Sequence, residues 1–186
     1  MRDTKQKLTP VTIGLHWFVG LTFMAVLLVG FYMETMEAYA LYPLHKSFGA
    51  LLFFFVMVRV VWRVMNGWPV PLKDDNKLEL LVAKLVHWVL IIGTILMPVS
   101  GMLMSAAGGR GVFIFGFELI AANPDAANPG KVIPLNEGLA GLAHSAHGII
   151  GWVMVVAILA HIAGAIKHHH VFKNDTLLRM KGKEVE

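Results

Sequence analysis

Cysteine is absent from this chain, and charged residues are scarce. None of the 186 residues is cysteine, and only 15% are Asp, Glu, Lys or Arg. The missing thiols exclude disulfides, cysteine-bound iron–sulfur clusters, c-type haem attachment and thiol catalysis. Soluble domains average about 25% charged residues, so the composition disfavours both a soluble globular protein and a disordered one. It also disfavours a nucleic-acid binder, despite a formal net charge of +4.

What the chain has instead is hydrophobic residues, 56% in all. Four long apolar runs cover about 11–33, 45–63, 80–104 and 144–167, each long enough to cross a hydrocarbon layer of roughly 30 Å as a helix. They lack the alternation of a membrane β-barrel. We therefore expect an all-α membrane protein, a four-helix transmembrane bundle forming a single domain over 1–186. The long connection 105–143 is expected to carry a function or structure of its own, its apolar first half capping the bundle or lying on the membrane.

The basic residues predict how the chain is oriented. The tails and the second connection carry thirteen Lys and Arg, against three in the first and third connections, where Lys46, Arg110 and Lys131 lie. Cytoplasmic segments carry the excess of Lys and Arg. Both termini are therefore expected in the cytoplasm. The thirteen are Arg2, Lys5, Lys7, Arg59, Arg63, Lys73, Lys77, Lys84, Lys167, Lys173, Arg179, Lys181 and Lys183.

The nine histidines are many for so apolar a chain, and ionisable residues inside membrane helices are functional hypotheses by default. His147 and His161 lie 14 residues apart on the fourth expected helix. That spacing is about 21 Å along the axis and about 40° short of four whole turns, so both face the same way. Two inward histidines at these depths indicate two haems stacked across the membrane, one near each surface.

Each haem needs a second histidine from another helix, since neutral imidazole is a good axial ligand. His45 is the expected partner at the outer level, and either His16 or His87 at the inner level. Hydrogen bonding between helices is the alternative role for each of these histidines. Glycines along the helices offer places where backbone or a porphyrin approaches closely; they are Gly49, Gly93, Gly101, Gly148 and Gly151.

Two cations are candidates for binding haem propionates. Arg59 follows His45 by 14 residues and so faces the interior at the inner level, while Lys46 suits the outer haem. For Arg59, a snorkelling role at the cytoplasmic interface is the equal alternative. The trio His168–His170 is expected to form only a basic cytoplasmic surface.

At this stage the chain resembles the bacterial cytochrome b561 family over essentially its whole length. The resemblance rests on the order and spacing of several short motifs, of which the C-terminal ones are the most specific. They are GLHW at Gly14–Trp17, LHKSFG at Leu44–Gly49, VRVVWR at Val58–Arg63, LVHW and MPVSG between Leu85 and Gly101, FGF at Phe115–Phe117, AHGIIG from Ala146, and DTLLRM at Asp175–Met180.

The resemblance implies two b-type haems between four helices, in the inner (plasma) membrane of a bacterium. Its ligand pattern assigns the outer haem to His45 and His147, and the inner haem to His16 and His161. His87 also looks like a family position, whereas His144 does not. At least one member is similar to a superoxide oxidase, which passes electrons from superoxide at the outer face through the haems to ubiquinone.

We therefore expect an oxidoreductase that joins superoxide to the quinone pool. His87 is the expected quinone-site residue, relaying a proton on the cytoplasmic side, with an interhelical hydrogen bond as its equal alternative. The competing function is an electron-transfer subunit that connects a partner dehydrogenase to quinone. A bundle without redox activity is disfavoured by the paired histidines.

Overall fold

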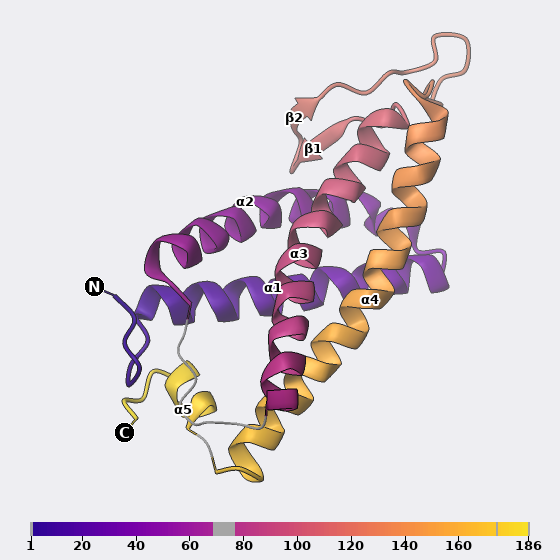
Figure 1. Cartoon of the computed structure of the whole chain (residues 1–186). Coiled ribbons are helices and arrows are strands. Elements are labelled where there is room, and N and C mark those ends of the chain that lie inside the picture. Colours follow the sequence, from indigo (N-terminus) through magenta and orange to yellow (C-terminus); the bar gives the residue numbers. More distant parts are fainter. Residues whose placement is uncertain (1, 69–76, 174, 186) are drawn as a thin grey trace.

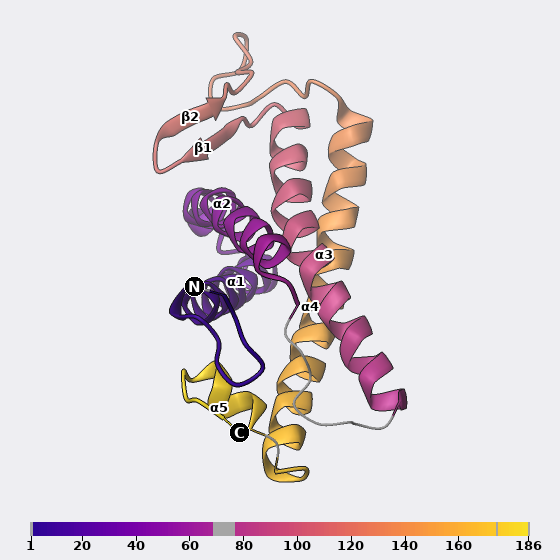
Figure 2. The same cartoon turned by 60° about the vertical axis from the view of Figure 1, so that its left-hand side comes forward.

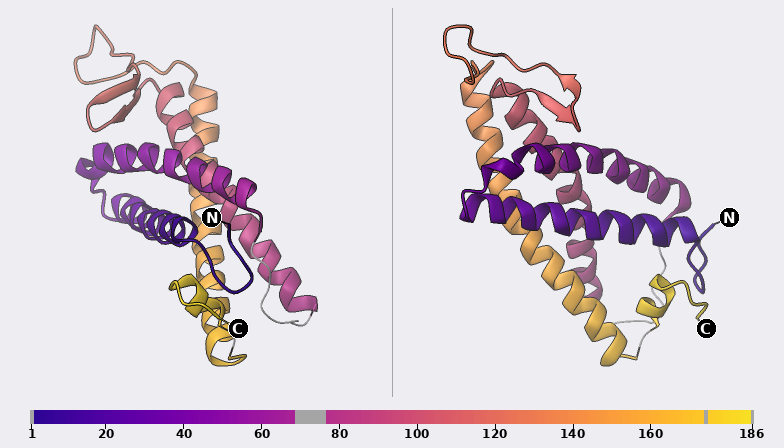
Figure 3. Two further views of the ribbon diagram at one scale, coloured as in Figure 1. Left: turned by 90° about the vertical axis from the view of Figure 1, so that its left-hand side faces the viewer. Right: turned by 180° about the vertical axis from the view of Figure 1, so that it is seen from behind.

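The computed structural model describes residues 2–68, 77–173 and 175–185. Four long helices dominate it: α1 (Pro10–Thr35), α2 (Tyr42–Asn66), α3 (Lys77–Ala107) and α4 (Glu137–His170). All four are long and apolar enough to cross a membrane, which confirms the predicted four-span, all-α fold. They form two antiparallel pairs, α1 with α2 and α3 with α4, and the pairs cross at a steep angle (Figures 1 and 3). The two termini lie on the same side of the molecule (Figure 2), which is consistent with an even number of membrane crossings.

The helix boundaries follow local capping residues. At the start of α1, the Thr9 side chain accepts a hydrogen bond from the Thr12 N–H, and Pro10 occupies the first turn, where its missing N–H costs nothing. The expected start of the fourth helix at 144 is wrong. Asn136 caps α4 by accepting from the Leu139 N–H, so this helix begins about two turns earlier, at Glu137.

The third helix contains Pro98, and proline is the commonest cause of a kink inside a helix. The helix continues through Pro98 to Ala107, and Figure 2 shows α3 changing direction along its length. Lys73, one of the basic residues expected on the cytoplasmic side, lies outside the described residues.

The long connection between α3 and α4 carries a small β-hairpin that covers one end of α2. Of the two arrangements expected for this connection, the structure shows the one that caps the helices. Strands β1 (Val112–Ile114) and β2 (Phe117–Ile120) pair antiparallel. The turn residues Phe115 and Gly116 both have positive φ, at 49° and 87°, which matches the twist of a two-residue hairpin. Lys46 Nζ donates to the Gly111 carbonyl at 3.1 Å, and the Phe115 N–H donates to Ser47 Oγ at 3.0 Å. These bonds fix the hairpin over the start of α2.

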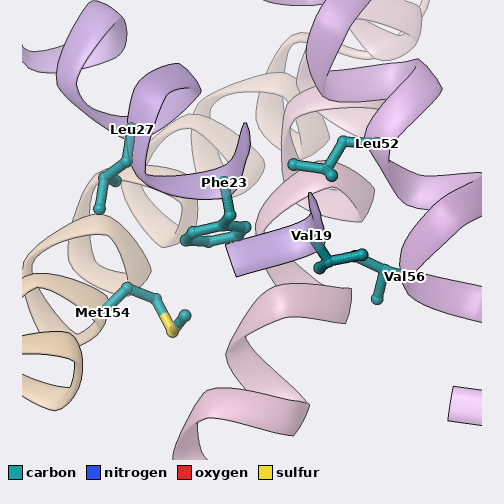
Figure 4. Close-up of a cluster of buried hydrophobic side chains, with 6 residues drawn as sticks. All are labelled: Val19, Phe23, Leu27, Leu52, Val56 and Met154. Atoms are coloured by element: carbon teal, nitrogen blue, oxygen red, sulfur yellow. The ribbon is translucent and has the colours of Figure 1, made fainter. Parts of the chain in front are cut away.

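The apolar core lies where the two helix pairs cross. Figure 4 shows its six side chains, which come from α1, α2 and α4: Val19, Phe23, Leu27, Leu52, Val56 and Met154. Met154 is fully buried, and a Cβ on Gly93 of α3 would clash with its sulfur. Gly93 therefore allows α3 to approach α4 closely. Many large apolar side chains elsewhere on the helices are exposed, including Leu28, Val64 and Leu159, as lipid-facing surfaces require.

The remaining helices are short. A 3-10 turn, η1 (Tyr39–Leu41), joins α1 to α2, and α5 (Thr176–Met180) follows α4 near the C-terminus. Figure 1 shows α5 beside the N-terminal segment.

Candidate functional site

The structure brings His45 and His147 together from different helix pairs. Their ring centres are 6.3 Å apart and their planes are 86° apart. Metal–imidazole bonds of about 2.0 Å, with roughly 1.1 Å from each nitrogen to its ring centre, place two axial rings about 6 Å apart. The spacing therefore fits two imidazoles that share one metal ion.

His147 is held in one orientation by α3. Its Nδ1 lies 3.0 Å from the Met97 carbonyl oxygen and 3.0 Å from Ser100 Oγ. A carbonyl only accepts, so Nδ1 carries the proton and donates it to Met97, and Nε2 is left as the nitrogen with a lone pair. Histidines that bind metals donate their other ring N–H to a backbone carbonyl or carboxylate in this way.

Two glycines make room for these rings. A Cβ on Gly101 of α3 would lie 3.0 Å from His147 Cε1, and a Cβ on Gly30 of α1 would lie 3.0 Å from His45 Cε1. Gly101 was among the glycines expected to allow close approach, whereas Gly30 was not. No local sequence signal marks Gly30, because its neighbour on α2 is known only once the helices are packed.

A cavity of about 40 Å³ is lined by both His45 and His147, with Phe23, Gly49 and Pro98 among its other lining residues. This volume suits one water molecule, and a porphyrin is much larger. The residues that line the cavity therefore have to move apart when a haem binds. Gly49 gives such a group space, because a Cβ there would meet nothing within 4 Å.

The inner histidines form a group of three. His16 and His161 have ring centres 6.1 Å apart with planes at 57°, while His87 and His161 are 5.3 Å apart at 74°. His161 therefore contacts both expected partners, and the sequence alternatives stay open on distance alone. His87 differs from His16 in being exposed, whereas His16 is half-buried.

Arg59 reaches the same inner group from α2. Its Nη2 donates to His16 Nδ1 at 3.0 Å. Among the described residues no carboxylate pairs with Arg59. A half-buried guanidinium without an acidic partner is costly in a membrane, so a carboxylate on a bound group, such as a haem propionate, would satisfy it.

A larger cavity of about 490 Å³ lies between the start of α2 and the β-hairpin. Lys46 and Arg110 supply its positive charge, and its aromatic lining residues are Tyr42, Phe113 and Phe115. The Lys46 ammonium lies 5.9 Å from the Phe113 ring centre. Lys46 directly follows His45, so the charged cavity adjoins the outer histidine pair.

The other histidines stay outside these groups. His144 is exposed, and its Nδ1 lies 3.2 Å from Met104 Sδ. His169 and His170 contact each other at the end of α4, 4.9 Å between ring centres. Within the described ranges, no three His, Asp or Glu side chains converge enough to bind a metal ion by themselves. The paired histidines therefore suit a metal whose other ligands come from a cofactor, as haem iron has.

Comparison with known proteins also points to a haem-binding membrane protein. The family model for prokaryotic cytochrome b561 matches residues 7–183. This chain belongs to the prokaryotic cytochrome b561 family. It is a multi-pass membrane protein that binds b-type haem and transfers electrons.

Named relatives cover nearly the whole chain. Cytochrome b561 homolog 2 of Escherichia coli (strain K12) is 30% identical over 187 residues, which is 97% of this chain and 94% of that protein. Probable superoxide oxidase CybB of Yersinia pestis is 26% identical over 183 residues, 96% of this chain and 98% of its own. Cytochrome b561 homolog 1 of E. coli is 25% identical over 173 residues, 90% and 93% of the two chains.

Proposed function

We propose that this cytochrome holds two b-type haems, one between His45 and His147 and one between His16 and His161. The observation that carries the proposal is that α4 alone supplies one member of each pair. The two α4 histidines are 14 residues apart, so the two sites are separated by about 21 Å of helix axis. The distribution of basic residues supports an orientation in the bacterial inner membrane with both termini cytoplasmic.

The protein's part is to hold and orient these groups. His147 keeps Nε2 available because Met97 accepts its other ring proton. Arg59 and Lys46 are the proposed partners of the inner and outer propionates. Bound haem supplies reversible one-electron chemistry, which carries electrons from one site to the other.

Superoxide is the proposed electron donor at the outer site. Cations in a cleft raise the local concentration of a small anion, and the cavity lined by Lys46 and Arg110 lies beside His45. Each superoxide gives up one electron and leaves as dioxygen. The likeness to a probable superoxide oxidase of Yersinia pestis supports this donor.

Ubiquinone is the proposed acceptor at the inner site. Two electrons from two superoxide anions, with two protons from the cytoplasmic side, convert ubiquinone to ubiquinol. The ring centres of His87 and His161 are 5.3 Å apart, and His87 is exposed. A lipid-dissolved quinone could therefore reach His87 beside the inner site. We assign His87 the role of relaying a proton to the quinone.

A superoxide pulse applied to the purified cytochrome alone tests the donor. We expect rapid reduction of the haem absorbance, followed by reoxidation when a short-chain ubiquinone is added. An unchanged spectrum after the pulse would exclude superoxide as the donor. A Lys46→Gln variant should be reduced more slowly, with a weaker dependence on salt.

One observation favours a second function, in which a partner dehydrogenase supplies the electrons. The hairpin exposes apolar side chains outside the membrane spans, notably Phe117, Leu119 and Ile120, and exposed apolar patches mark interaction sites. Co-purification of a tight dehydrogenase partner, together with no response to superoxide, would favour this function.

A further inference from the structure

The two ends of the chain interlock beside the inner histidines. We name residues 175–185 the C-terminal clasp. Arg179, which is only 4% exposed, donates from Nη1 to the Lys5 carbonyl at 2.7 Å. The Val185 N–H donates to the Gln6 carbonyl at 3.1 Å. The clasp is therefore fastened to the N-terminal segment, and Figure 2 shows α5 lying close to it.

The N-terminal segment is in turn fastened to α1 and α2. The Asp3 carboxylate accepts from Arg63 Nη2 at 2.6 Å, from Thr12 Oγ1 at 2.9 Å and from the Thr9 N–H at 2.8 Å. Burial alone would raise the pKa of Asp3, but these hydrogen bonds lower it below its ordinary value. Arg63 lies one turn beyond Arg59 on α2, so this network joins the clasp to the helix that carries the inner arginine.

A more direct link runs through Trp17. Its indole Nε1 donates to the Met180 carbonyl of the clasp at 2.9 Å. The same ring contacts His16 edge to face, with ring centres 5.6 Å apart and planes at 82°. The backbone of the clasp therefore fixes the indole ring, and the indole ring restricts the imidazole.

This arrangement differs from that of the outer pair. His147 is oriented by a carbonyl and a hydroxyl of α3, both inside the helices. His16 has Arg59 on its Nδ1 and an edge-to-face contact with the Trp17 ring. Groups that contact a metal-binding histidine set its orientation and its basicity.

We propose that the C-terminal clasp positions His16 through Trp17, which makes Trp17 a positioning residue for the inner site only. The inference rests on the proposed role of His16 as a haem ligand. Loss of the Trp17–Met180 bond would leave the imidazole free to turn, and would alter the electronic state and retention of the inner haem. The outer haem, oriented from α3, would be unaffected.

The experiment uses the full-length haem-loaded protein in detergent. Trp17→Phe removes the hydrogen bond and keeps a ring against His16, while Arg179→Gln loosens the clasp from the other side. Glu184→Gln is the matched control, because Glu184 also ties the clasp to the N-terminal segment, through Lys7, but this ion pair is exposed. The readouts are the electron paramagnetic resonance signals and redox titration of each haem, and the rate of haem transfer to apomyoglobin.

We expect Trp17→Phe and Arg179→Gln to shift the inner-haem signal and potential, and to speed inner-haem loss about tenfold. The outer haem and the Glu184→Gln protein should match the wild type. Unchanged inner-haem signals in Trp17→Phe, or equal shifts in both haems, would overturn the clasp proposal. His16→Ala separates the two claims: if it retains both haems, the ligand assignment fails and the clasp proposal fails with it. If His16→Ala loses one haem while Trp17→Phe changes nothing, only the clasp proposal fails.

Discussion

Arg59 donates to Nδ1 of His16 over 3.0 Å. A guanidinium only donates, so Nδ1 accepts this bond and the proton of neutral His16 lies on Nε2. A histidine that binds metal through Nε2 carries its proton on Nδ1 instead. The Arg59–His16 bond and the proposed metal bond are therefore mutually exclusive, and Arg59 must turn to another acceptor when haem binds.

Arg59→Gln is expected to weaken retention of the inner haem, because its proposed propionate partner loses a charged donor. We expect haem to leave the inner site about 10–100-fold faster. Arg59→Lys is the control that keeps the charge without the planar fork, and it should retain more inner haem than Arg59→Gln. The pyridine haemochrome assay after gel filtration measures the loss, and equal retention in all three proteins would contradict the assignment.

The ligand set predicts two haems per chain. Replacing His45 or His147 with alanine should remove the outer haem, and replacing His16 or His161 the inner one, so that each variant keeps about one haem. His87→Ala should keep both. If His87→Ala loses a haem while His16→Ala keeps both, the inner partner of His161 is His87.

His87→Ala, with both haems retained, tests the acceptor side. Haem reduction by superoxide should stay fast, while reoxidation by added ubiquinone should slow by about 10²-fold, the scale of a lost proton relay. Stopped-flow absorbance measures both steps. Unchanged reoxidation would make His87 a packing residue and move the quinone site elsewhere.

Gly101→Val should disturb the outer site alone. Its new Cβ would lie 3.0 Å from His147 Cε1, so the imidazole would have to turn away from His45. We expect loss of the outer haem with the inner haem retained, read from the redox titration. Gly141→Ala is the control, since a Cβ there meets nothing within 4 Å; it should leave both haems in place.

Asp3→Asn should lower the stability of the folded protein by about 2 kcal/mol, because it removes a charge that accepts several hydrogen bonds. The pKa of Asp3 is lowered in the folded state. Its contribution is therefore complete above the unfolded pKa of about 3.9 and is lost as pH falls through the lower folded pKa. Thermal unfolding in detergent should show the difference between wild type and variant shrinking as pH falls below about 4. A difference that stays constant with pH would contradict this account.

The sequence predicted the four spans because long apolar runs leave few alternatives in a membrane. It missed the first two turns of α4 because residues 137–143 are rich in Gly and Ala and have little hydrophobic pattern. Asn136, which caps the helix just before this segment, was the residue that could have indicated its start. The hairpin was missed for a related reason. Its turn uses Phe115 at positive φ, a position that Gly or Asn usually occupies.

The spacing of His147 and His161 correctly predicted that each would meet a histidine from another helix. It did not separate His16 from His87, because both approach His161 from different helices at similar distances. The DTLLRM motif marked this segment as a family feature, but no sequence pattern predicted the contacts of the clasp. Its bonds run from Arg179 and Trp17 to backbone carbonyls far away in the chain, and every residue has such a carbonyl.

The core cluster of Figure 4 affects how electrons and protons can cross the membrane through this protein. Met154 lies seven residues from His147 and seven from His161, so this cluster of apolar side chains, which we call the apolar layer, reaches between the two histidine pairs. The layer offers no proton donor, so an electron can tunnel through it while a proton cannot follow. In the proposed orientation, each inward electron moves against an inside-negative membrane potential, at a cost of up to about 2.3 kcal/mol per 100 mV for a full crossing. A large membrane potential would therefore slow electron transfer through the cytochrome, and loss of that potential would speed it up.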